Sequence, residues 1–102
     1  MGVPKLESKN MTYRFHGNYA ELRVGTGINE KSYVLSEYGQ PIELDDVRAR
    51  EVVDQGCRLL PEGEFVEVFP GKVNKMEPDF QTKHEAVEQL FQTWKSSLLN
   101  KH

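Results

Sequence analysis

Cys57 and three histidines are the side chains of this 102-residue chain best suited to nucleophilic or metal chemistry. His16, His84 and His102 lie far apart, and none belongs to an H-x-x-x-H or H-x-x-E pattern that would place two ligands on one helix face. Cys57 has no catalytic flanking signature, and cysteine is among the residue types most often buried. We therefore expect no metal site and interpret Cys57 as a packing residue.

Carboxylates are the next candidates for chemistry. Glu62, Glu64 and Glu67 could act as acid and base only in a pocket that shifts their pKa values, and their alternation with apolar residues is typical of a solvated strand face. No G-x-S-x-G nucleophile pattern is present. The G-x-G at residues 25–27 lies between two predicted strands, whereas a phosphate loop precedes a helix. We expect no enzyme activity and no cofactor.

Composition limits the partners and the location of the chain. A net charge of −3 argues against direct nucleic-acid binding, which needs a basic surface. No apolar run is long enough for a membrane span, and we find no signal-peptide core. A single cysteine excludes an internal disulfide and favours a reducing, cytoplasmic location.

A β-hairpin is predicted near the start of the chain. Strands at 12–16 and 19–24 are separated by Gly17-Asn18, a pair that tolerates the positive φ angles of a two-residue turn. That turn would place Arg14 opposite Glu21 on the solvent face and pair Tyr13 with Leu22 on the buried face.

The middle of the chain predicts two further strands, a capped helix and a return strand. Asp45 is the expected N-cap of the helix, Gly56 its left-handed stop, and Cys57 the residue that contacts Val52 across the helix end. Pro41 cannot donate to a ladder, so its strand is expected at a sheet edge. The two further strands are predicted at 31–36 and 41–44, and the single return strand is predicted from 59–61 together with 64–69.

The last third predicts a long amphipathic helix at about 82–100, with Thr82-Lys83-His84-Glu85 as a capping box. Residues 1–10 are interpreted as a flexible tail, and 11–102 as a single domain. The order β-β-β-β-α-β-α predicts an α+β fold, an antiparallel sheet or small partly open barrel with two helices packed on one face.

Two surfaces are candidates for binding a partner protein. Residues 37–67 carry nine acidic side chains against three arginines, a dense charge that could dock on a basic partner or simply maintain solubility. The end of the last helix extends beyond what a short strand needs for cover and could offer an apolar patch, including to a second copy as a homodimer. The predicted partner-binding residues are Glu43, Glu62, Glu64, Glu67, Trp94, Leu98 and Leu99.

Residues 39–60 resemble a pattern of short bacteriophage and prophage proteins, in which a hairpin, a short helix and a glycine precede the last strand. The matching positions here are Gly39, Ile42, Leu44, Ala49, Val52, Gly56 and Leu60. The resemblance implies a small virion-associated or accessory protein and assigns no functional residue.

The sequence therefore favours a non-catalytic protein-interaction or structural accessory module of phage or mobile-element origin. The alternative is an acidic decoy that inhibits a nucleic-acid-binding partner by presenting its negative surface. A small enzyme would require a concave pocket that gathers titratable groups.

Overall fold

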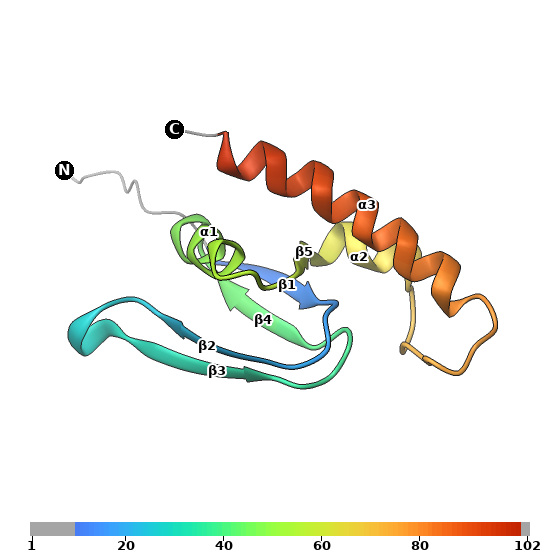
Figure 1. Cartoon of the computed structure of the whole chain (residues 1–102), viewed down its shortest axis with the longest axis horizontal. Helices are drawn as coiled ribbons and strands as arrows, with labels where there is room; N and C mark the ends of the chain where they lie inside the picture. Colours follow the sequence, from blue (N-terminus) through green and yellow to red (C-terminus); the bar gives the residue numbers. More distant parts are fainter. Residues whose placement is uncertain (1–9, 101–102) are drawn as a thin grey trace.

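Five antiparallel strands and three α-helices form an α+β fold without a closed barrel in the computed structural model, which describes residues 10–100 (Figure 1). The predicted fold class is confirmed. In Figure 1, α3 runs along one side of the molecule and the β2–β3 ribbon along the other. The strands are β1 (Met11–Phe15), β2 (Ala20–Val24), β3 (Lys31–Leu35), β4 (Pro41–Leu44) and β5 (Leu59–Pro61). The helices are α1 (Asp46–Asp54), α2 (Glu62–Val68) and α3 (Phe80–Leu99), with a short 3-10 helix, η1 (Gly27–Asn29), after β2.

Strand β1 lies at the centre of a three-stranded sheet ordered β4-β1-β5, and β2 pairs with β3 in a separate two-stranded ribbon. The predicted β1–β2 hairpin is therefore wrong: Arg14 lies opposite Leu60 and Pro41, and Leu22 lies opposite Tyr33. Backbone groups at the end of β1 are already bonded, because the Phe15 N–H donates to Gln40 and the Phe15 carbonyl accepts from Gly39. Pro41 does begin an edge strand, as predicted.

Helix α1 follows its predicted caps. Asp45 Oδ1 accepts the Arg48 N–H at 2.8 Å, which satisfies a donor that the first helical turn leaves free. Gly56 has a φ of +96°, and the N–H groups of Gly56 and Cys57 donate to Val53 and Val52, the two bonds of a Schellman end. Cys57 is buried there, as predicted.

Helix α2 replaces the strand predicted at 64–69. Phe65 and Phe69 are four residues apart, so a helix places both on one face, and their rings stack at 5.2 Å in the core. Pro61 ends β5, and Glu62 and Glu64 then occupy the first turn of α2, where negative charge is favourable. The strand prediction was wrong because, over so short a segment, the apolar residues 65, 66, 68 and 69 fit the periodicity of a helix as well as that of a strand.

Helix α3 begins two residues before its predicted start at residue 82 and ends at Leu99, close to its predicted end. Its N-cap is Asp79, whose side chain makes no cap bond, so the capping box expected at Thr82 is wrong and Thr82 lies inside the helix. The terminal residues Lys101 and His102 and the proposed tail, apart from Asn10, lie outside the described residues.

The core consists of two clusters of buried side chains, and β5 contributes to both. Leu59 belongs to the cluster formed mainly by β1 to β4 and α1, whereas Leu60 belongs to the cluster formed mainly by α2 and α3. Trp94 of α3 packs against both clusters and lies 5.6 Å from the Tyr13 ring. Helix α1 also contributes to both, with Val52 in the first cluster and Val53 in the second, so β5, α1 and Trp94 connect the two clusters.

Substitutions at two glycines test two features of the fold that the sequence did not predict, the turn bonded to β1 and helix α2. Gly39 has a φ of +85°, and a Cβ there would lie 3.3 Å from Val73, so Gly39→Ala should destabilise the protein by about 1–2 kcal/mol.

Gly63 lies in α2 with open space around it, so Gly63→Ala should stabilise the protein by about 0.5 kcal/mol because alanine favours a helix. Urea unfolding measures both, and a Gly63→Ala variant clearly less stable than wild type would contradict the helix.

Candidate functional site

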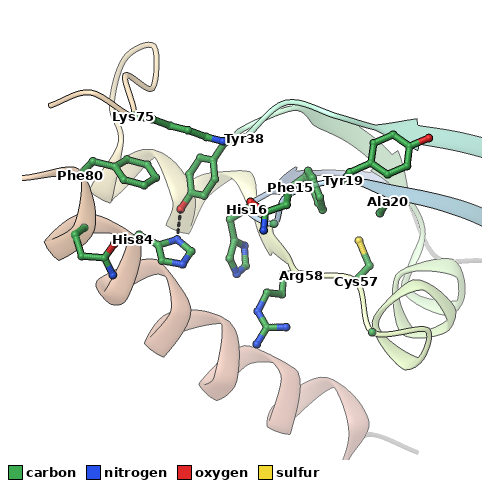
Figure 2. A pocket seen from close by; sticks show the side chains of 14 residues that line it. Phe15, His16, Tyr19, Ala20, Tyr38, Cys57, Arg58, Lys75, Phe80 and His84 are labelled. Carbon is green, nitrogen blue, oxygen red and sulfur yellow. Dashed lines mark hydrogen bonds between the residues drawn. The ribbon is translucent and has the colours of Figure 1, made fainter.

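An open cavity of about 580 Å³ lies where the end of β1, the turn after β3, the α1–β5 connection and the first turns of α3 meet (Figure 2). Its lining combines aromatic rings with nitrogen-bearing side chains. The lining residues are Phe15, His16, Gly17, Asn18, Tyr19, Ala20, Tyr38, Gly56, Cys57, Arg58, Lys75, Phe80, Gln81 and His84.

His16 is fully buried at the inner side of this cavity. Its backbone N–H donates to the Arg58 carbonyl at 3.0 Å, which fixes the residue directly after β1. The imidazole meets the Phe91 ring edge-on at 5.1 Å, and Figure 2 shows it between His84 and Arg58. Nε2 is 3.4 Å from Glu88 Oε1, an electrostatic contact too long to serve as a good hydrogen bond. Within residues 10–100, neither ring nitrogen has a hydrogen-bond partner.

Glu88 connects His16 to the cavity rim through Arg58. The Arg58 guanidinium donates to both Glu88 oxygens, at 3.0 and 3.2 Å, and Gln92 donates at 2.8 Å. Burial on its own raises the pKa of Glu88, but these hydrogen bonds and the Arg58 charge bring that pKa below its ordinary value. Glu88 is therefore ionised at neutral pH and is already neutralised by Arg58.

Burial lowers the pKa of His16 to about 4, against an ordinary value of 6.5, and the nearby Glu88 carboxylate only partly offsets this. At neutral pH the ring is uncharged. A buried polar ring without hydrogen-bond partners costs free energy.

Tyr38 and His84 form the outer wall. The Tyr38 hydroxyl is hydrogen-bonded to His84 Nδ1 at 2.8 Å, and burial raises the pKa of Tyr38 above its ordinary value, so the phenol keeps its proton (Figure 2). The Tyr38 ring contacts Phe65, Phe69 and Phe80 at centroid distances of 5.1 to 6.1 Å. This aromatic packing holds the hydroxyl in place toward His84.

His16 and His84 lie far apart in the sequence and share no ligand spacing, yet the fold brings their ring centroids to 6.3 Å. A signal was present in α3, where His84, Glu88 and Phe91 follow at four and three residues and so share one helix face. The position of His16, which directly follows β1, could not be found in the same way, because it depends on how the sheet is paired.

The chemistry available in the cavity is hydrogen bonding and positive charge. Burial raises the pKa of the Cys57 thiol to about 11, so it stays protonated at neutral pH and is a poor nucleophile. No group of three or more His, Cys, Asp or Glu side chains in the described part of the chain is arranged to hold a metal ion.

The predicted acidic residues do not form one uncompensated surface. Glu62 is paired with Arg14 through bonds of 3.0 and 2.8 Å, and it lies in α2 with Glu64 and Glu67 rather than on a strand. Glu64 is half-buried and Glu67 is exposed. Glu43 is exposed on β4, at the far edge of the sheet from β5.

The predicted apolar patch at the end of α3 is wrong for its central residue. Leu98 is only 7% exposed, because α3 packs on α1 and β5 and Leu98 joins the core cluster that contains Val53 and Leu60. Trp94 is half-buried between the two clusters. Leu99 is half-buried, and its carbonyl accepts a bond of 3.3 Å from Arg50.

A second surface feature, not predicted from the sequence, is the outer edge of β3. The opposite edge of the ribbon is covered by α1, since Gln55 donates to the Arg23 carbonyl at 2.9 Å and the Gly25 N–H donates to Glu51 at 3.2 Å. Within residues 10–100, β3 pairs only with β2. Val34 is 54% exposed on β3 and Ile28 is 99% exposed at the ribbon tip.

No protein-family model, curated protein or solved structure matches this chain. The helices of the described residues include none that is both long and apolar enough to cross a membrane.

The pKa of His16 predicts how stability depends on pH. Because the folded pKa is lowered, the unfolded chain binds the proton first, and stability falls as pH falls from about 6.5 toward about 4. Between pH 6 and pH 5 this residue should cost about 1 kcal/mol of unfolding free energy. The contribution of Glu88 is lost at lower pH, because its pKa lies below that of an ordinary carboxyl.

Urea unfolding of wild type and His16→Phe across this pH range measures the effect as a difference in slope. The variant removes the titrating ring and should show the shallower dependence, whatever its absolute stability. Parallel curves between pH 6 and pH 5 would exclude a buried, neutral His16.

Proposed function

We propose that the protein is a non-catalytic interaction module that accepts an extended segment of a partner protein along the outer edge of β3. The observation that supports this is the asymmetry of the β2–β3 ribbon, which has one edge covered by α1 and the other unpaired within the described residues. An unpaired edge is a template for an added strand, because its backbone groups recognise any extended chain.

The backbone of β3 indicates which groups are offered. Gln40 Nε2 donates to the Val34 carbonyl at 2.9 Å, so Val34 directs its backbone groups away from β2. Backbone direction alternates along a strand, so Ser32 presents its N–H and C=O on the same edge. The Gln40 amide oxygen also accepts from Ser36 and Glu37, which closes the end of the edge beyond Val34.

Exposed side chains favour an apolar partner segment. Val34 lies on the open strand, and Ile28 at the tip is almost completely accessible. A partner strand with apolar residues at alternate positions would cover Val34 while its backbone pairs with Ser32.

A phage or mobile-element origin and a cytoplasmic location belong to this proposal as predictions from residues 39–60 and from the single cysteine. The acidic-decoy alternative is the weaker one, because Arg14 neutralises Glu62 and Arg48 pairs with Glu51 at 2.9 Å. A decoy would bind basic peptides in a strongly salt-dependent manner.

Selection from a displayed library of random 12-residue peptides tests the proposal with a matched pair of variants. Ser32→Pro removes the outward N–H without removing a bond to β2, whereas Ser32→Ala keeps the N–H and removes only the hydroxyl. Selected peptides should bind wild type and Ser32→Ala alike and bind Ser32→Pro about tenfold more weakly, the loss expected for one or two backbone bonds.

Circular dichroism and urea unfolding of both variants establish that the fold is retained. Peptides that bind Ser32→Pro as well as wild type, or a selection that yields no binder, would contradict docking at this edge. Basic peptides that lose binding in salt and on charge reversal at Glu43, Glu64 and Glu67 would support the decoy instead.

A further inference from the structure

The cavity at His16 differs in charge from the rest of the chain. Its lining includes Arg58, Lys75 and the two histidines, and no Asp or Glu is among the residues that form it. The chain as a whole carries a net charge of −3. A cavity whose only charged lining residues are basic, within an acidic protein, favours an anion over a cation or a neutral polar ligand.

Lys75 is the cation available to such an anion. Arg58 already gives two bonds to Glu88, so its charge is compensated. Lys75, in contrast, makes a cation–π contact of 5.8 Å with the Tyr38 ring and has no carboxylate partner among the described residues. The start of α3 adds to the positive potential, because Phe80 and Gln81 of its first turn line the cavity.

The inner wall contains an unmet hydrogen-bonding demand. His16 is completely buried, lines the cavity, and has no hydrogen-bond partner for either ring nitrogen within residues 10–100, with the Glu88 carboxylate 3.4 Å from Nε2. A ligand group that reaches this ring would satisfy a polar group that is otherwise costly to bury. This observation is independent of the charges at the rim.

Flat apolar surfaces form the remaining walls. Tyr38 and Phe80 lie edge-to-face at 5.1 Å, and Phe80 stacks on His84 at 5.9 Å with an interplanar angle of 16°. Figure 2 shows these rings on one side of His16, with Phe15, Tyr19 and Ala20 on the other. Such walls suit a planar ring, which can contact the aromatic faces and edges.

We propose that this cavity binds a small aromatic carboxylate, with the carboxylate at Lys75, the planar body between the aromatic walls, and a polar edge at His16. The single uncompensated cation matches a monoanion, whereas a phosphate dianion would leave much of its charge unpaired. The cavity volume lies within the range of small-molecule sites. This site is separate from the β3 edge, so either proposal can fail without the other.

A ¹⁵N-labelled sample titrated with 6-hydroxy-2-naphthoate tests the site, because its hydroxyl supplies the polar edge for His16, and the neutral 6-hydroxy-2-naphthamide is the matched ligand. The naphthoate should shift the amide signals of Gly17, Ala20 and His84, with a dissociation constant on the order of 1 mM for a ligand of this size. The naphthamide should bind about tenfold more weakly, because it lacks the charge that Lys75 recognises.

Lys75→Gln and Lys72→Gln provide the matched protein variants, since both lysines are exposed in the same loop and only Lys75 lines the cavity. Lys75→Gln should weaken naphthoate binding about tenfold and leave naphthamide binding unchanged, and Lys72→Gln should change neither. Amide spectra of the free variants verify the fold. The proposal would be overturned if the two ligands bound equally, or if the two lysine variants had equal effects. It would also be overturned if the shifts lay elsewhere, or if about 10 mM naphthoate caused no shifts.

Discussion

Strand β1 is hydrogen-bonded along both edges, and this double pairing determines how the rest of the chain is arranged. With β4 on one side and β5 on the other, β1 has no edge left for β2, which instead forms a separate ribbon with β3. Arg14 on β1 then faces α2 and binds Glu62, with its guanidinium 5.6 Å from the centre of the Phe65 ring. The short helix is thus fixed to the central strand by charge and by packing.

The same pairing creates both candidate binding features. His16 follows β1 directly, and its backbone bond to Arg58 holds the imidazole against α3, beside Glu88 and Phe91. The turn at Gly39, bonded to Phe15, brings Tyr38 to His84 and forms the outer wall of the cavity. Because β2 is displaced from β1, the ribbon projects with α1 on one edge and an open strand on the other.

Local features of the fold could be predicted from the sequence, and long-range pairing could not. The caps of α1 and the positions of β2 to β4 follow from side chains within a few residues, where Asp45 and Gly56 have clear roles. Alternation shows which face of β1 is buried but not which strand lies beside it, so Gly17-Asn18 was mistaken for a hairpin turn. The cavity depends on that strand pairing. Of its polar environment, only the face of α3 that carries His84 and Glu88 could be predicted from residue spacing. Glu43 and Glu67 are exposed, but Glu62 is half-buried, and the arginine that pairs with it comes from a distant strand.

A double-mutant cycle on Arg14 measures the strand pairing most directly, because the two arrangements give this side chain different partners. Urea unfolding gives the stabilities of Arg14→Gln, Glu62→Gln and the double variant. The coupling free energy should be about 1 kcal/mol, lower than for a buried ion pair because this pair is partly exposed to solvent. The parallel cycle with Glu21→Gln should give a coupling near zero, since Glu21 instead accepts from Tyr19. Coupling of Arg14 to Glu21, with none to Glu62, would show that β1 pairs with β2 and would contradict the account.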